Sequence, residues 1–336
     1  MKIALYEHFS SRPPGTSDPG LMAEGRALRD AAGADFTRLP GVVTVPIQGE
    51  AAFDAMVSAC DAALVIAPEQ DGVLERLCRR VERHGRLLLG PGSRAVRLLA
   101  DKHRLALRLA AAGVDTPRTA RVRFRGASRS LREVPLPFVL KPRDGCGGRG
   151  VVLVRRARDI GDALRAVRRV TRRADLLVQE HIEGDSVSVS IVASATLLPL
   201  GLNRQRLRPG RALEYLGGET FWPHPLTALA EETARAALSA AAVPAIGYLG
   251  VDLVLGPRGA TVIEINPRLT TSYIGLRRSI RENLAGLILR AVTGRALPRR
   301  VRPLRRCLFG AWGGPVRGPG QSTWRTRSAG TSAASI

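Results

Sequence analysis

The sequence contains almost no lysine. Lysine and arginine together account for 52 of the 336 residues, and Lys2, Lys102 and Lys141 are the only lysines among them. Arginine presents a planar fork and lysine a compact point charge, so the two are not equivalent beside phosphate groups. Because arginine is used almost everywhere else, Lys102 and Lys141 are predicted to be phosphate ligands. Lys2 is interpreted as a surface residue at the start of a strand.

Aromatic residues are also scarce, at 4% of the chain. The formal net charge of +23 would suit a nucleic-acid partner, because a basic surface releases counterions when it binds phosphate. Single strands, however, are held largely by stacking on aromatic side chains, which this composition hardly offers. Much of the basic excess lies on predicted helix faces and after Pro298. The composition argues against nucleic acid, although a non-enzymatic polyanion-binding protein stays open as an alternative.

The chain has four cysteines and no long apolar run. Cys60, Cys78, Cys146 and Cys307 form no CxxC pair and have no histidine at metal-ligand spacing, so reduced, unpaired thiols are expected. No apolar stretch approaches the length of a membrane-spanning helix, and the first residues lack the pattern of a signal peptide. These features predict a soluble cytoplasmic protein without membrane contact. A homo-oligomer is left open.

The pattern of apolar segments changes along the chain. Before residue 95, apolar strands alternate with helical segments, which is typical of a small doubly wound α/β domain. After residue 138, polar and apolar residues alternate, as in antiparallel strands. Strands are expected at 2–7, 62–67, 86–89, 138–141, 151–154, 176–180, 186–191, 248–255 and 260–266. Helices are expected at 21–32, 72–84, 94–112, 159–173, 226–241 and 276–293.

The strongest chemical signal is a predicted hairpin between two apolar strands. Pro257 and Gly259 suit its tight turn. With the turn centred between them, Asp252 lies opposite Glu264. Asn266 then shares their face, because side chains two apart point the same way. Two carboxylates about 5 Å apart repel by roughly 3 kcal/mol at an effective dielectric near 20. A divalent cation removes that cost, so the trio is predicted to bind Mg²⁺ or Mn²⁺ that bridges phosphates.

A glycine-rich loop joins the predicted strands 138–141 and 151–154. It matches GxGxxG, but that dinucleotide-binding fingerprint requires a helix after its last glycine, and here a valine-rich strand follows. It also lacks the GK[ST] ending of a Walker A loop. A hairpin loop can instead fold over a triphosphate with its backbone N–H groups facing the anion. The residues predicted to do so are Gly145, Gly147, Gly148 and Arg149, with a plain surface hairpin tip as the alternative.

Together, the two lysines, the loop and the acidic hairpin resemble the ATP-grasp superfamily over roughly residues 1–295. The resemblance implies an α/β fold, α+β in the nucleotide domain, with ATP between two antiparallel sheets behind a small doubly wound domain. The expected units are an N-terminal pre-ATP-grasp domain (1–95), a subdomain with the lysines and the loop (96–175), a subdomain with the adenine hinge and metal ligands (176–297), and a disordered basic tail (298–336).

The resemblance also implies which residues bind the nucleotide. Lys102 and Lys141 match the two phosphate-binding lysines of the family. The segment 178–184 looks like the adenine hinge, in which backbone groups near Glu180 and Ile182 would read the base.

Roles for the remaining polar residues follow from the same resemblance. A glutamate shortly after the hinge commonly holds the ribose in this family, and here Glu183 and Asp185 are rival candidates. Arg268 matches a position that steadies the transferred phosphoryl group or the tetrahedral intermediate. Arg268 and Lys141 are therefore the predicted catalytic residues.

Several segments look more closely like the tyramine–glutamate ligases of methanofuran biosynthesis and their relatives. These segments are 5–7, 202–205, 215–219 and 266–273. Such enzymes join the γ-carboxylate of glutamate to a primary amine through an acyl phosphate, so small-molecule partners, ATP and a divalent metal are implied. Arg204 and Arg268 are candidates to clamp a substrate carboxylate. An ATP-grasp ligase for other amino acids or peptides, of dipeptide or pyrrolysine type, is the alternative.

Overall fold

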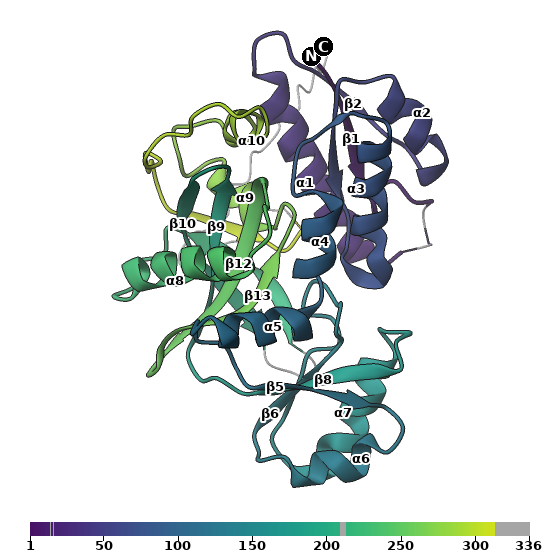
Figure 1. Cartoon of the computed structure of the whole chain (residues 1–336), viewed down its shortest axis with the longest axis vertical. Coiled ribbons are helices and arrows are strands. Elements are labelled where there is room, and N and C mark those ends of the chain that lie inside the picture. The colour runs from purple at the N-terminus through teal and green to yellow at the C-terminus, as the bar shows by residue number, and fades with distance from the viewer. Residues whose placement is uncertain (14, 16, 209–212, 313–336) are drawn as a thin grey trace, which may run out of the picture.

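The structure, a computed structural model, describes residues 1–13, 15, 17–208 and 213–312. Its N-terminal unit is a parallel sheet in the order β2-β1-β3-β4, flanked by helices (Figure 1). The strands are β1 (Lys2–Glu7), β2 (Val43–Pro46), β3 (Ala62–Ile66) and β4 (Leu87–Leu88). The helices are α1 (Pro19–Thr37), α2 (Phe53–Ser58), α3 (Val73–Arg83) and α4 (Ser93–Leu99).

This parallel sheet is covered on both faces. Ile3 and Leu5 of β1 pack in the core that α1 completes, whereas Ala4 and Tyr6 pack with α2 and α3. Every residue of β3 is buried. A parallel strand with helices on both sides requires such an uninterrupted apolar run. The predicted doubly wound domain is confirmed. The sequence analysis did not predict β2 and α2, which also belong to this domain.

A second, antiparallel sheet has the order β5-β8-β6-β7. It consists of β5 (Thr119–Arg123), β6 (Phe138–Lys141), β7 (Val152–Val154) and β8 (Asp175–Glu180), with α6 (Ala127–Ser130) and α7 (Ile160–Arg168). Phe138 and Leu140 pack against these helices, while Val139 and Lys141 point to the opposite face and line a large cavity. Because β8 belongs to this sheet, the sheet continues past the border predicted at residue 175.

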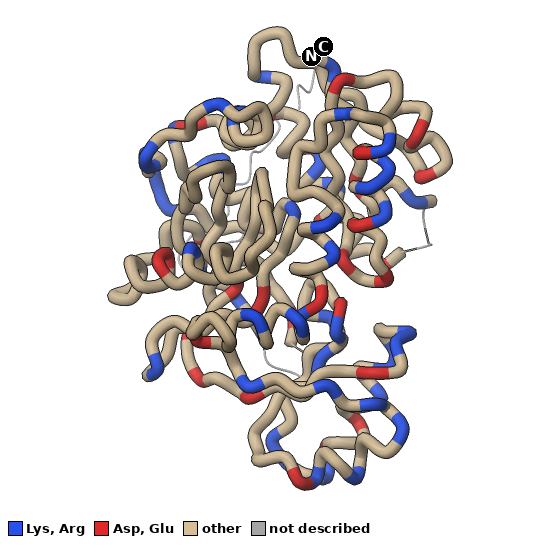
Figure 2. The backbone as a smooth tube through the Cα atoms, viewed as in Figure 1, with Lys and Arg blue, Asp and Glu red and all other residues tan. Residues whose placement is uncertain are grey.

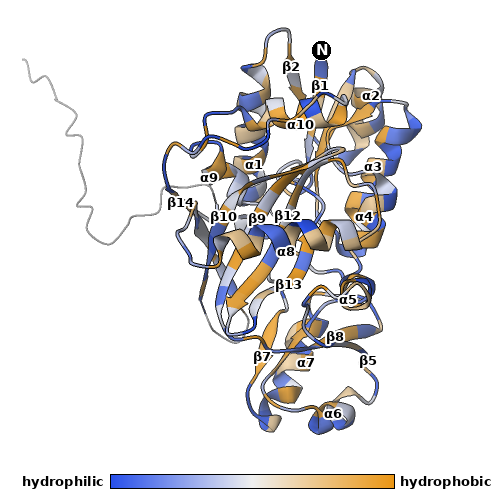
Figure 3. Ribbon diagram, turned by 60° about the vertical axis from the view of Figure 1, so that its left-hand side comes forward, coloured by the Kyte–Doolittle hydropathy of each residue, from blue (hydrophilic) through white to orange (hydrophobic). Residues whose placement is uncertain are grey.

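The largest sheet is antiparallel, in the order β13-β12-β9-β10-β11-β14. Its strands are β9 (Asp185–Ala193), β10 (Leu197–Arg208), β11 (Glu214–Thr220), β12 (Gly247–Gly256), β13 (Gly259–Asn266) and β14 (Cys307–Gly310). Helix α8 (Thr227–Ala240) crosses one face with Ala230, Ala234 and Ala237 buried (Figure 3). Small side chains allow this helix to approach the strands closely.

Capping residues change two of the predicted helices. The predicted helix 94–112 is divided into α4 and α5 (Lys102–Ala111). The predicted helix 276–293 is shorter than expected, because α9 (Ser272–Leu276) ends where it should begin and α10 (Leu284–Val292) covers only its second half. Asp101 and Asn283 leave the helical conformation, and each side chain accepts a hydrogen bond from a backbone N–H three residues on. The break at Asp101 places Lys102 in the first turn of α5.

The chain after residue 297 returns to the large sheet. β14 pairs with β11, and Val301 and Phe309 are buried. The prediction of a disordered tail is therefore wrong for residues 298–312, because their few apolar side chains reach the core. The rest of that predicted tail, residues 313–336, lies outside the described residues.

Charged residues are spread widely over the fold. Figure 2 shows Lys and Arg in all parts of the described chain, with Asp and Glu among them. The four cysteines are free, as expected, and three of them are buried. In the part of the chain that the structure describes, no helix combines the length and apolar character needed to cross a membrane.

Candidate active site

The hairpin of β12 and β13 carries the predicted metal ligands. Gly259, just after its two-residue turn, has a φ of 95°, which favours glycine. Strand pairing places Asp252 directly opposite Glu264. Asn266, two residues further along β13, lines the same cavity as both carboxylates. The predicted pairing is present at this position, and a bulge directly after Asp252 shifts the register towards the turn.

The two carboxylates of the hairpin are held in different ways. Asp252 accepts hydrogen bonds from the side-chain amides of Gln205 and Asn266, each at 3.0 Å. Glu264 instead pairs with Lys102 Nζ at 3.1 Å. Burial, and then the Glu264 carboxylate, raise the pKa of Asp252 to about 7. Burial alone would raise the pKa of Glu264 as well, but nearby lysine ammonium groups outweigh it and hold that pKa below its usual value.

Both internal lysines reach this hairpin from other elements. Lys102 begins α5 and Lys141 ends β6, and Lys141 is only 2% exposed. Burial lowers the pKa of Lys141 to about 8, with the Glu264 carboxylate opposing the shift. Burial also disfavours the charge on Lys102, but Glu264 and Glu69 outweigh it and raise its pKa. Lys141 therefore lacks sufficient negative charge around it, which phosphate oxygens would supply.

This arrangement fits a divalent cation bound together with polyphosphate. Carboxylate and amide oxygens are ligands that Mg²⁺ and Mn²⁺ accept, and the adjacent lysines suit phosphate. A cation beside Asp252 would also offset the burial and the repulsion by Glu264 that raise the pKa of Asp252. Among the described residues, no three His, Cys, Asp or Glu side chains come together as metal ligands. The remaining ligands of the cation would have to be other oxygens, such as those of phosphate.

The glycine-rich loop between β6 and β7 borders the cavity. Gly147, Gly148 and Gly150 have φ values of 62°, 69° and 71°, in a region that other residues rarely adopt. Gly147, Gly148 and Arg149 line the cavity. Gly145 does not line it and packs instead on the neighbouring proline ring. Three of the four predicted loop residues thus face the space where phosphates are expected.

Two hydrogen bonds connect the N-terminal unit to this loop and to the segment after α7. The Asp71 backbone N–H donates to the Asp144 carboxylate at 3.2 Å. Gln70 Nε2 donates to the Val170 carbonyl at 2.7 Å. Both donors lie in the 3₁₀ turn Gln70–Gly72 that follows β3. The loop is therefore held in place over the cavity by a segment far away in sequence.

The predicted adenine hinge, 178–184, comprises the end of β8 and the residues after it. Glu180 and Ile182 line the cavity. The two ribose candidates do not: Glu183 is exposed, and Asp185 faces two basic side chains outside the cavity, at 3.8 and 3.9 Å. The structure favours neither of them as a ribose ligand, and Ser186 is the polar residue just after the hinge that does line the cavity.

The hinge ends at a glycine that the structure requires. Gly184 has a φ of 149°, and a Cβ there would overlap the Leu255 carbonyl oxygen. Gly184→Ala is expected to lower the free energy of unfolding by about 2–4 kcal/mol, because unfavourable backbone geometry and a backbone clash add together. Urea denaturation measures this change. Gly85→Ala is the matched control, since Gly85 has a φ of 62° with open space around it. Equal losses for the two variants would contradict the role of the clash.

Arg204 lies outside the cavity. Neighbouring residues on a strand point to opposite faces, and Gln205 turns towards Asp252. The Arg204 guanidinium lies 4.9 Å from the centre of the Trp222 ring, and its side chain is 47% exposed. The expectation that Arg204 binds a substrate carboxylate is therefore wrong, because side chains alternate along β10 and Gln205, not Arg204, points into the cavity.

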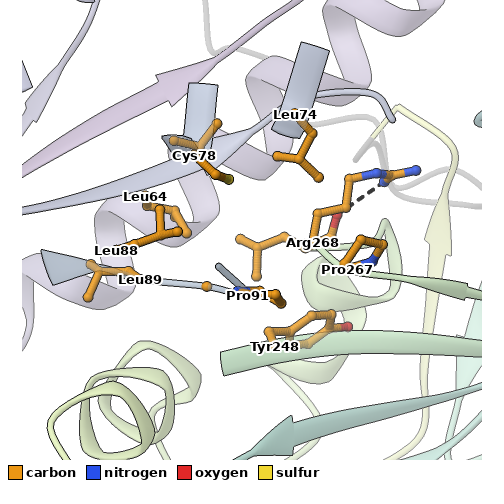
Figure 4. A pocket seen from close by; sticks show the side chains of 12 residues that line it. Leu64, Leu74, Cys78, Leu88, Leu89, Pro91, Tyr248, Pro267 and Arg268 are labelled. Carbon is orange, nitrogen blue, oxygen red and sulfur yellow. Dashed lines mark hydrogen bonds between the residues drawn. The ribbon is translucent and has the colours of Figure 1, made fainter. Parts of the chain in front are cut away.

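Arg268 is buried where β13 meets the N-terminal unit, and it lines the cavity. Its Nε donates to Glu69 at 2.9 Å. Burial opposes the charge, but the Glu69 carboxylate outweighs it and raises the pKa of Arg268. Figure 4 shows Leu74, Pro91 and Tyr248 around a space beside this arginine. That space measures about 10 Å³, room for one water at most. The Arg268 side chain is held by its hydrogen bonds to Glu69 and to the Leu269 carbonyl.

Four further cavity residues were not singled out by the sequence. They are Glu24 of α1, Gln205 of β10, Tyr215 of β11 and Thr271 after β13. Gln205 and Tyr215 lie in segments that carry the family resemblance, but their spacing assigns them no role. Glu24 and Thr271 are distant in sequence, and only the fold brings them together. The cavity that these residues share with the hairpin and the loop has a volume of about 1400 Å³.

Comparison with known families defines the class of protein. A model described as an ATP-grasp domain matches residues 99–272, and one described as a pre ATP-grasp 3 domain matches residues 28–96. The chain belongs to the ATP-grasp family, whose enzymes use ATP and a divalent metal. The expected fold class is thereby confirmed.

Individual relatives narrow the class further. Tyramine–L-glutamate ligase of Methanocaldococcus fervens is 30% identical over 245 residues, which cover 72% of this chain and 69% of that protein. Phosphoribosylamine–glycine ligase of Leifsonia xyli is 29% identical over 320 residues, covering 87% and 70%. The crystal structure of an ATP-grasp superfamily protein from Archaeoglobus fulgidus matches with a TM-score of 0.69 at 25% identity, over 91% of each chain.

Fold, site and relatives together make the chain an ATP-dependent, ADP-forming carboxylate–amine ligase that resembles tyramine–L-glutamate ligase. A catalytic function replaces the alternative of a non-enzymatic polyanion-binding protein.

Proposed function

We propose that this ligase joins the γ-carboxylate of glutamate to a primary amine, with tyramine as the candidate amine and Mg²⁺ as the metal. The observation that carries the proposal is the convergence of Asp252, Glu264 and Lys141 at one cavity, with Lys102 paired to Glu264 beside it. The likeness to a tyramine–L-glutamate ligase supports the choice of substrates, and with it a place in methanofuran-type cofactor biosynthesis.

Each group around the cavity has a role in this proposal. Asp252, Glu264 and Asn266 would hold the metal ion, which supplies positive charge beside the phosphates when it is bound. The phosphates would be held by Lys102, Lys141, Gly147, Gly148 and Arg149. Backbone groups near Glu180 and Ile182 would read the adenine.

The reaction needs no nucleophilic side chain. The substrate carboxylate attacks the γ-phosphorus of ATP, which releases ADP and leaves an acyl phosphate. The amine then attacks the acyl carbon, and phosphate leaves. Lys141 and Arg268 would stabilise the negative charge that develops, which is the main task of an enzyme in phosphoryl transfer. The loop over the cavity would exclude water, which would otherwise hydrolyse the acyl phosphate.

A ligase for a different amino acid is the second candidate. The likeness to a phosphoribosylamine–glycine ligase over 87% of this chain supports it. That enzyme couples a different acid and a different amine, so the two candidates predict different products.

Mass spectrometry of the products tests the proposal. Incubation with ATP, Mg²⁺, glutamate and tyramine is expected to give one ADP for each γ-glutamyltyramine, and omission of any component should stop both products. A screen of ADP release over other amino acids and amines serves as the comparison. Turnover only with an acid other than glutamate would contradict the proposed substrate and favour the second candidate.

A further inference from the structure

One part of the cavity is formed by the start of α1. Leu21 and Glu24 of this helix and its N-cap residue Asp18 line the cavity, as does Tyr215 of β11. Leu21 and Glu24 are three residues apart, so both lie on the face of the helix that meets the cavity. Trp312 also lines this part. An acidic group between apolar and aromatic side chains is suited to an organic cation.

Glu24 is fixed in position by its neighbours. The Thr271 hydroxyl donates a hydrogen bond to the Glu24 carboxylate. The next residue, Gly25, lies so close to the buried end of β1 that a Cβ there would overlap the Glu7 carboxylate. This contact brings α1 tightly against the strand, which sets the depth at which Glu24 enters the cavity.

Glu24 also lies near the reacting groups. The Glu24 carboxylate interacts electrostatically with the Arg268 guanidinium and with the Tyr215 hydroxyl. After burial, the carboxylates of Glu24 and Asp252 are the next causes that raise the pKa of Tyr215. The Tyr215 hydroxyl is therefore within electrostatic range of both carboxylates, and all three side chains line the same cavity.

The Glu24 carboxylate has no cationic partner of its own among the described residues. Arg268 is committed to Glu69 and to the Leu269 carbonyl. Burial raises the pKa of Glu24, with Thr271 and Arg268 opposing. A carboxylate held in a cavity by a single hydroxyl gains most from a cation that arrives with the substrate. Asp18 is a weaker candidate, because its carboxylate already caps α1.

We infer that Glu24 binds the ammonium group of the amine substrate and accepts the proton that this group must lose before it attacks. The inference rests on the proposed amide-bond formation. An ammonium ion has no free electron pair, so Glu24 first takes one proton and leaves a neutral amine. The nitrogen then forms a bond to the acyl carbon while the bond from that carbon to the phosphate oxygen breaks. The second proton leaves the nitrogen with the departing phosphate.

The test compares two nucleophiles in the full-length protein. Hydroxylamine is largely uncharged at neutral pH and traps an acyl phosphate as a hydroxamate without needing an ammonium site. Glu24→Gln is expected to raise the KM for tyramine at least about tenfold, because a charge-assisted contact is lost. Hydroxamate formation from ATP, Mg²⁺ and glutamate, and the KM values for ATP and glutamate, should stay within about twofold of wild type.

Asp30→Asn removes a charge from an exposed position of the same helix and should change neither reaction. An unchanged KM for tyramine in Glu24→Gln would overturn the inference, as would an equal loss of hydroxamate formation. If Glu24→Gln does not fold, Glu24→Asp decides by the same measurements, since its shortened side chain should also raise the KM for tyramine. Absence of hydroxamate formation in the wild type would refute the proposed substrate acid instead.

Discussion

Glu264→Gln is expected to lower kcat for ADP release by about 10²- to 10³-fold, the scale seen when one group that stabilises transition-state charge is removed. Glu264 lies opposite Asp252 and pairs with Lys102 at 3.1 Å, so the change removes a predicted metal ligand and frees an ammonium group together. A coupled assay of ADP release at several Mg²⁺ concentrations measures the effect. Higher Mg²⁺ should restore only part of the rate.

Glu232→Gln is the matched control for this change. Glu232 is an exposed residue of α8 that does not line the cavity. Its replacement should leave kcat and the Mg²⁺ dependence unchanged. A Glu264→Gln enzyme with the wild-type rate and Mg²⁺ dependence would show that the carboxylate is not a metal ligand.

Lys141→Met is expected to raise the KM for ATP and to lower kcat, with a combined loss in kcat/KM of at least about 10²-fold. Lys141 is buried with a pKa of about 8, because few negative charges compensate it before phosphates arrive. Methionine keeps the volume and the apolar stem, so the variant isolates the charge. Steady-state kinetics over a range of ATP concentrations separates the two parameters.

The scarcity of lysine provides the control for this second variant. Lys2→Met changes the exposed lysine at the start of β1, and it should leave both parameters at wild-type values. Lys102→Met should resemble Lys141→Met. Equal kinetics for wild type and Lys141→Met would contradict phosphate binding by this residue.

The sequence predicted the hairpin well because its information is local. A tight turn and a two-residue repeat are sufficient to place Asp252 opposite Glu264, and the register bulge begins only after that pair. The two lysines could be singled out because arginine occupies almost every other basic position. The buried apolar run of β3 likewise identifies a central parallel strand without reference to its partners.

Contacts between distant segments could not be predicted in the same way. Glu24 reaches Thr271 only because α1 packs on the end of β1 near the large sheet. Arg204 was expected in the site, but the choice between it and Gln205 depends on which face of β10 is covered. The low apolar content after residue 298 concealed a strand, since β14 buries only Phe309 and pairs with an edge of the large sheet that is already formed.

The bonds from Gln70 and Asp71 have a consequence for turnover. The Asp71 bond connects the glycine-rich loop, and the Gln70 bond the segment after α7, to the N-terminal unit. Two such bonds together contribute on the order of 2 kcal/mol. Any opening of the glycine-rich loop that breaks them would therefore also loosen the contact with the N-terminal unit, so we expect nucleotide exchange to depend on that contact.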